Sequence, residues 1–261
     1  MHPISLAAGV LPDFSPQATM RAAVAAGYDA TGLWVDLETW TEATTREVNA
    51  ILADNALPAL DVEVVWFMPG PPDDRHRRVV DIGLATGAAN VLCVSSDPDD
   101  AATAAKLALL CEHAEGGIRI ALEFGLFTEV KSIGQANGIV RSVDHPAAAL
   151  LIDPLHLART GGTPEDVATL PHAWLPYAQF CDAGPLTYEV SDRAAIIEEA
   201  VDGRLQVGEG ILPLSALVDA FPENLPLSIE LRSKRLRDTY PDATDRAVAV
   251  LEATRKFLAS H

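Results

Sequence analysis

The chain has 261 residues, 49% of them hydrophobic, which is enough apolar material for a substantial core and too much for a disordered protein. Its formal net charge of -18 argues against proteins that bind nucleic acid or anionic membranes, because both functions need a basic surface. No run of the sequence approaches the ~18 apolar residues of a membrane span, and the first residues do not resemble a signal peptide.

Strand-like and helix-like segments alternate along the whole chain. A strand is expected first at residues 4–8. Ser15 followed by Pro16 predicts the N-cap and first position of a helix that ends near Ala26, with Gly27 as its C-cap. Further strands are predicted at residues 30–35, 59–65, 90–94, 118–123, 148–153, 175–181 and 227–231. Further helices are predicted at about residues 43–55, 73–86, 97–115, 133–143, 163 onward, 214–220 and 242–258.

This order of elements predicts the fold class. Strands separated by helical segments of about 10–15 residues indicate parallel βαβ units. Eight such units in a chain of this length, with no break in composition, predict a single TIM-barrel domain, (β/α)8, over residues 1–261. An open doubly wound α/β sheet is the alternative, but no glycine-rich phosphate-binding sequence follows the first strand.

Four successive β-like runs of the C-terminal half end on a carboxylate or an amide. These residues are Glu123, Asp153, Gln179 and Glu230. Acids are depleted in strands, so their recurrence at strand ends is unusual. In a barrel the C-terminal ends of the strands converge on one mouth, where active sites lie. Three carboxylates and an amide oxygen are ligands for a hard divalent cation, so the sequence predicts a metal site there.

A metal at this place suggests a reaction. A proton on the carbon next to a carbonyl is too weakly acidic for an unaided carboxylate to remove. A divalent ion that bridges the carbonyl and a neighbouring hydroxyl stabilises the enediolate that develops, as a Lewis acid and template. Proton abstraction next to a metal-bound carbonyl is therefore the expected chemistry.

Several motifs in the expected order carry a resemblance to a known family. They are Glu123 after the fifth strand, Asp153-Pro-Leu-His156, Gln179-Phe-Cys-Asp182, Gly208-Glu-Gly210 and Glu230-Leu-Arg232. With these motifs the chain resembles, over essentially its full length, the xylose-isomerase-like TIM barrels of the sugar phosphate isomerase/epimerase superfamily.

The resemblance implies a metal-dependent isomerase or epimerase of a sugar, a sugar phosphate or a cyclic polyol. It implies a metal bound by Glu123, Asp153, Gln179 and Glu230. It also implies catalytic roles for Glu123 and Glu230 as acid/base groups, and for His156 as a hydrogen-bond partner of a substrate oxygen. Most of the family has histidine where Gln179 stands, so the shell here is all oxygen. Mn²⁺ or Mg²⁺ is then favoured, Co²⁺ is an alternative, and Zn²⁺ is less favoured.

The alternative function is a metal-dependent dehydratase, a lyase, of a 3-dehydroshikimate-like or inosose-like substrate. Glutamine at the position of Gln179 also resembles a dehydratase branch of the family that acts on 3-dehydroshikimate. That branch carries a histidine two residues after the first glutamate, where this chain has Gly125. A barrel that binds a metabolite without catalysis is a third reading. A related nuclease of abasic DNA needs more histidine ligands and a surface that does not repel DNA.

Further substrate contacts are predicted around the same mouth. Arg232 follows Glu230 by two positions, so both side chains point into the mouth if the strand continues, and Arg232 can meet a substrate oxyanion or pair with an acid. The remaining candidates are Asp182, Trp34, Glu63, Trp66 and Glu209. Each has a structural alternative: a cap or salt bridge for Asp182, packing for the tryptophans and Glu63, and a turn for Glu209.

The three cysteines, Cys93, Cys111 and Cys181, show no CxxC spacing and cannot all pair with one another. Two of them lie within apolar runs, which favours buried thiols in a reduced, cytoplasmic protein. The expected partner is a small-molecule substrate, and no nucleic acid or membrane is expected. A homo-oligomer stays open.

Overall fold

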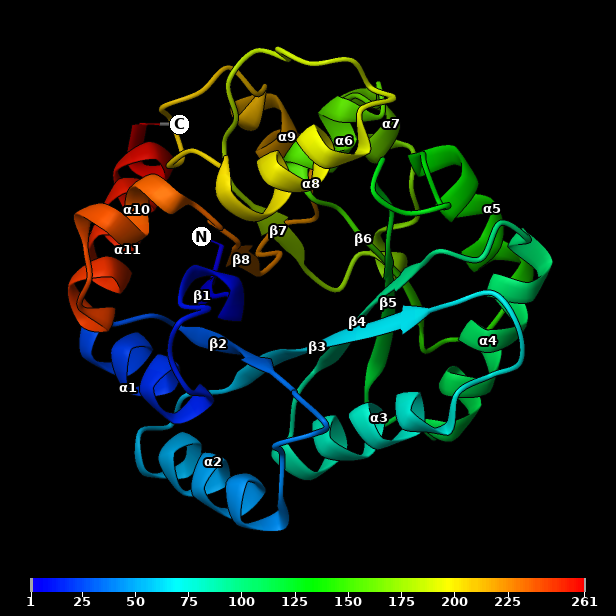
Figure 1. Ribbon diagram of the computed structural model, residues 1–261, viewed down its shortest axis with the longest axis horizontal. Helices are drawn as coiled ribbons and strands as arrows, with labels where there is room; N and C mark the ends of the chain where they lie inside the picture. The colour runs from blue at the N-terminus through cyan, green and yellow to red at the C-terminus, as the bar shows by residue number, and fades with distance from the viewer. Residues whose placement is uncertain (1, 261) are drawn as a thin grey trace.

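The computed structural model describes residues 2–260, and eight parallel strands form its centre (Figure 1). The strands are β1 (Ile4–Leu6), β2 (Ala30–Trp34), β3 (Ala59–Phe67), β4 (Asn90–Ser95), β5 (Arg119–Glu123), β6 (Ala148–Leu151), β7 (Ala178–Phe180) and β8 (Leu227–Ile229). Their order in the sheet is β6-β5-β4-β3-β2-β1-β8-β7. Every neighbouring pair is parallel, as βαβ connections require.

The sheet closes on itself between β6 and β7. A single parallel bridge joins Ile152 to Ala178, and the backbone N–H of Gln179 donates to the Ile152 carbonyl over 2.9 Å. The structure is thus a nearly closed (β/α)8 TIM barrel, which confirms the predicted fold class. The alternative of an open doubly wound sheet is wrong.

Helices surround the barrel (Figure 1). They are α1 (Pro16–Ala26), α2 (Glu42–Asp54), α3 (Asp74–Thr86), α4 (Asp100–His113), α5 (Ile133–Val143), α6 (Pro154–Arg159), α7 (Pro164–Ala168), α8 (Arg193–Asp202), α9 (Leu214–Ala220), α10 (Lys234–Thr239) and α11 (Ala243–Ser260). The first helix begins and ends as its sequence predicts: Ser15 accepts a hydrogen bond from the Ala18 N–H, and Gly27 takes the left-handed conformation at φ 85°. Within residues 2–260 no helix is both long and apolar enough to cross a bilayer.

Alternation along the strands divides the apolar side chains between two cores. In β5, Ile120 and Leu122 belong to the large core that includes the helices, whereas Ala121 belongs to a small second cluster. That cluster comprises Ala30, Leu60, Leu92, Val94, Ala121, Ala149, Leu151 and Tyr177. Since successive strand residues face opposite sides, the small cluster fills the barrel, and Glu123 continues its side toward the mouth.

Three helices were not predicted from the sequence: α6, α8 and α10. The first of these begins directly after Asp153, whose Oδ1 accepts from the His156 N–H over 3.0 Å, so a residue expected at the end of a strand is also an N-cap. The second, α8, lies between β7 and α9 in a segment for which no element was expected. Its side chains contribute to the mouth of the barrel.

Candidate metal and substrate site

The four predicted metal ligands lie at the C-terminal ends of adjacent strands. Glu123 is the last residue of β5, and Glu230 directly follows β8. Gln179 lies within β7, and Asp153 lies two residues beyond β6. All four side chains are buried. The barrel therefore gathers oxygen donors from four strands at one end.

A closer group, which combines two of these acids with His156, has the spacing of a metal site. One ligand atom each from Glu123, Asp153 and His156 lie within 4.8 Å of one another. Glu123 Oε1 and Gln179 Oε1 are buried and have no hydrogen-bond partner within residues 2–260. Buried oxygens without a partner are costly unless water or an ion satisfies them. These residues fit a divalent cation held mainly by oxygen.

Burial and mutual repulsion dominate the electrostatics of the acids. Burial raises the pKa of Glu123 well above its usual value, and the charges of Asp153 and Glu230 add to this. Burial also raises the pKa of Glu230, although Arg204 opposes the shift. A bound cation would relieve this repulsion. Burial lowers the pKa of His156 to about 4, so its imidazole is neutral at neutral pH.

Arg204 enters the middle of this group and was not predicted. Its Nη1 lies 2.5 Å from Asp153 Oδ2, and its Nη2 lies 3.3 Å from His156 Nε2 and 3.8 Å from Glu230 Oε2. Burial disfavours the charged form of Asp153, but the charge and hydrogen bond of Arg204 outweigh it and lower the pKa. Arg204 thus keeps one carboxylate of the site ionised.

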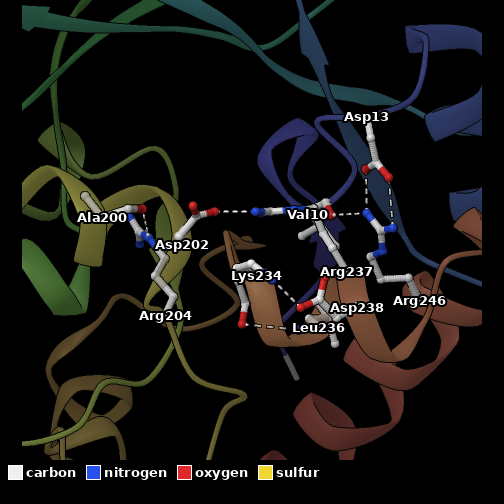
Figure 2. A network of polar contacts seen from close by, with 11 residues as sticks. Val10, Asp13, Ala200, Asp202, Arg204, Lys234, Leu236, Arg237, Asp238 and Arg246 are labelled. Carbon is white, nitrogen blue, oxygen red and sulfur yellow. Dashed lines mark hydrogen bonds and ion pairs between the residues drawn. The ribbon is translucent and has the colours of Figure 1, made fainter.

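The backbone places Arg204 by several contacts. Its Nε donates to the Ala200 carbonyl at the end of α8 over 2.9 Å, and Figure 2 shows the side chain folded back onto this carbonyl. Next to it, Asp202 pairs with Arg237 of α10 (Figure 2). Isolated bridges on either side join Gly203 to Ser233 and Leu205 to Asp182. The only signal in the sequence was an arginine four residues before Gly208-Glu-Gly210.

A cavity of about 240 Å³ opens above these residues. Seven predicted site residues line it: Trp34, Glu63, Trp66, Glu123, His156, Glu230 and Arg232. The residues of the lining that the sequence did not single out include Phe127, Arg204, and Arg193 and Ile197 of α8. Asp153 and Gln179 are buried and do not line the cavity.

Two other predicted site residues lie outside this cavity. Asp182 accepts hydrogen bonds from the backbone N–H groups of Ala183, Gly208, Gly210 and Leu212. It therefore shapes the Gly208-Glu-Gly210 turn. Glu209 forms an ion pair with Arg235 on the surface.

The position of Gly125 has no room for a side chain. A Cβ there would lie 2.6 Å from Cε1 of Phe127 and 3.2 Å from Cγ of His156. The Phe127 ring itself packs on the His156 ring at 4.8 Å between centroids. The histidine of the dehydratase branch therefore cannot be accommodated here unless Phe127 moves.

Beneath the site, β3 contributes two further buried acids, Asp61 and Glu63. Burial raises the pKa of Asp61 to about 7, and Glu230 adds to the shift. Burial raises the pKa of Glu63 well above its usual value, helped by Glu230 and Asp61. Asp61 Oδ1 and Glu63 Oε1 have no hydrogen-bond partner within residues 2–260. These acids hold protons at pH values where exposed carboxyls are ionised.

The model of the family described as xylose isomerase-like TIM barrel matches residues 20–256. The chain belongs to this family. Members with related sequences include two enzymes named 3-dehydroshikimate dehydratase. One is from Pseudomonas aeruginosa, with 28% identity over 93% of this chain and 38% of the relative. The other is from Pseudomonas putida, with 27% identity over 70% of this chain and 30% of the relative. This xylose isomerase-like barrel therefore matches only about a third of the length of these relatives.

Solved structures of the same fold include the IolI protein with a bound zinc atom, with a TM-score of 0.83 and 16% identity over 99% of this chain and 98% of that one. Another is a D-allulose 3-epimerase from Methylomonas in complex with D-allulose, with a TM-score of 0.72 and 16% identity over 98% of this chain and 96% of that one. At such identities the likeness concerns the fold alone.

Proposed function

We propose that this xylose isomerase-like barrel is a metal-dependent lyase that removes water from a small carbonyl-bearing cyclic polyol, a 3-dehydroshikimate-like substrate. The observation that carries the proposal is the group of buried polar side chains at the C-terminal ends of β5 to β8, in which ligand atoms of Glu123, Asp153 and His156 lie within 4.8 Å of one another beside a cavity. The motifs alone favoured isomerisation. The two related dehydratases support dehydration instead.

The residues have distinct proposed roles. Glu123, Asp153, Gln179 and Glu230 would hold a Mg²⁺ or Mn²⁺ ion, since all four donate oxygen. When bound, this ion would supply the positive charge that stabilises an oxyanion next to the deprotonated carbon.

Glu230 is the proposed proton acceptor, because it lines the cavity and Arg204 and Arg232 favour its charged form against the effect of burial. His156, neutral at neutral pH, would hydrogen-bond a substrate hydroxyl. Glu63 lines the same cavity and keeps its proton. It is suited to protonate the hydroxyl that leaves.

Isomerisation or epimerisation is the second candidate function, and the packing at Gly125 favours it. The dehydratase branch has a histidine at this position, and here Phe127 fills its place. Both reactions start with the same proton abstraction. They differ in whether a β-hydroxyl leaves or a proton returns to carbon.

The test begins with chelator-treated protein reloaded with Mn²⁺, Mg²⁺, Co²⁺ or Zn²⁺, and with melting temperature as the first readout. An ion that binds the folded state raises the melting temperature by mass action. A substrate screen in deuterium oxide then follows both the absorbance of a conjugated product and deuterium in recovered substrate. Loss of water supports the lyase, and deuterium exchange without loss of water supports the isomerase or epimerase. If none of these ions shifts the melting temperature, the proposed metal site is wrong.

A further inference from the structure

A second cavity of about 220 Å³ lies beside the first and shares a wall with it. Its lining comes mainly from the segment after β1 and the start of α1: Ala8, Gly9, Leu11, Pro12, Phe14, Pro16 and Thr19. Trp34 and Arg232 line both cavities. These two side chains therefore form the partition between the cavity above the metal site and the second cavity.

Arg232 is the charged member of this wall, and its guanidinium is free to bind. The guanidinium carbon lies 5.9 Å from the centroid of the Trp34 ring. This cation–π arrangement holds one face of the guanidinium against the ring. Its Nε is buried and has no hydrogen-bond partner within residues 2–260. Within residues 2–260 Arg232 forms no ion pair with a carboxylate. Its charge nevertheless opposes the effect of burial on the pKa values of Glu63 and Glu230.

Arg204 differs from Arg232 in this respect. It donates to Asp153, Ala200 and Cys181, so most of its donors are already used. The buried Nε–H of Arg232 has no acceptor, so it is an unsatisfied donor that a ligand can satisfy. The apolar walls of the second cavity would strengthen an ion pair formed there.

Gly9 permits this arrangement. A Cβ at Gly9 would lie 3.0 Å from Cγ of Arg232 and 3.0 Å from Oε1 of Glu230. The stem of Arg232 and the proposed proton acceptor therefore lie close to the same point.

We infer that Arg232 binds an oxyanion of the substrate, a carboxylate or a phosphate, at the boundary between the two cavities and against the face of Trp34. The guanidinium edge suits such a group because it can donate two parallel hydrogen bonds. The charge distribution agrees: the chain as a whole carries -18, yet Arg193, Arg204 and Arg232 all line the first cavity. This inference deepens the proposed function and rests on it for the placement of the reacting carbon.

Calorimetric titration of Mn²⁺-loaded protein with two matched pairs of probes tests the inference. One pair is shikimate and its methyl ester, and the other is D-fructose 6-phosphate and D-fructose. We expect the anion of at least one pair to bind about tenfold more tightly than its neutral partner, as for a charge-assisted contact. In Arg232→Gln this preference should disappear through loss of affinity for the anion, with the affinity for the neutral probe nearly unchanged.

Arg235→Gln is the matched control, because Arg235 lies three residues further on, pairs with Glu209 and lines neither cavity. It should bind as the wild type does. The pair whose anion binds more tightly shows whether the group bound by Arg232 is a carboxylate or a phosphate. Equal binding within both pairs, no binding of any probe, or a preference that survives in Arg232→Gln would overturn the inference. Repeating the titrations on metal-free protein separates the two proposals. If the probes bind equally well with and without Mn²⁺, the proposed metal-dependent function fails. The preference for the anionic probe still tests the role of Arg232.

Discussion

Arg204 and Asp153 form an ion pair with both side chains buried, and Arg204 Nη1 lies 2.5 Å from Asp153 Oδ2. Asp153 is also a proposed metal ligand, so one carboxylate would bind both the guanidinium of Arg204 and a metal ion. The two cations are therefore expected to be energetically coupled at this residue.

The first prediction follows from that coupling. Arg204→Met leaves the buried charge of Asp153 without its partner, which typically costs about 3–5 kcal/mol of unfolding free energy. Mn²⁺ would compensate the charge, so the loss should be smaller by about 1 kcal/mol or more when the ion is present. Urea unfolding with Mn²⁺ and with chelator measures both values.

Arg246→Met is a matched control for this measurement. Arg246 is also buried and pairs with Asp13 and the Val10 carbonyl (Figure 2), rather than with a proposed metal ligand. The unfolding free energy lost in Arg246→Met should be the same with and without Mn²⁺. An Arg204→Met variant that behaves in the same way would show that Asp153 does not share the site with a metal.

Glu230→Gln is expected to separate catalysis from metal binding. The amide keeps an oxygen near the ion but cannot accept a proton, so turnover should fall by about 10²–10⁴-fold while metal affinity falls much less. Steady-state kinetics and metal titration on the same preparation measure the two effects. Glu223→Gln, at an exposed glutamate before β8, is the control. Equal losses of turnover and metal affinity would make Glu230 a ligand without a role in proton transfer.

Gln179 is predicted to set the metal preference. Gln179→His replaces a neutral oxygen with an imidazole nitrogen, so the preference should shift toward Zn²⁺ or Co²⁺. Gln179→Ala should weaken the binding of every divalent ion. Competition titrations on chelator-treated proteins give the order of affinities. If neither substitution changes metal content or preference, Gln179 is not a ligand.

Asp61 is predicted to make stability depend on pH. Its pKa in the folded protein is raised to about 7 by burial, so between about pH 4 and pH 7 the folded state binds a proton that the unfolded state has lost. Stability should fall as pH rises through this window. At ~1.4 kcal/mol per pKa unit, the contribution of Asp61 is at most roughly 4 kcal/mol.

Asp61→Asn should therefore raise the melting temperature at about pH 8 and change it much less at about pH 5. The measurement is thermal unfolding of metal-free protein at both pH values. Asp54→Asn, at an exposed aspartate at the end of α2, should show no such difference. An Asp61→Asn variant with the same pH dependence as the wild type would mean that Asp61 stays ionised in the barrel.

The elements that the sequence predicted well have local signals. Residues 16–26 form a helix because Ser15, Pro16 and Gly27 mark its ends, and residues 133–143 form one as predicted. The strand-end acids were found for a similar reason, since each interrupts an apolar run. Such signals depend only on neighbouring residues.

The features that the sequence did not predict depend on distant contacts. Arg204 reaches Asp153 across 51 positions of the chain, and the bridges on either side of it and the Ala200 carbonyl direct it there. The helix α8 has one buried residue, Ile196, so it lacks the apolar stripe by which a helix is recognised. The steric exclusion at Gly125 depends on a ring two residues away, which no periodicity reveals.

The single bridge between Ile152 and Ala178 makes the seam between β6 and β7 the weakest joint of the barrel wall. Asp153 and Gln179 follow these two residues directly, one on each side of the seam. A cation bound by both Asp153 and Gln179 would link β6 to β7 across this seam. Amide exchange in the two strands would then slow on metal binding more than in β3 and β4, which pair with each other at five positions. Ion binding would in this way add a second connection between β6 and β7, where the backbone supplies a single bridge.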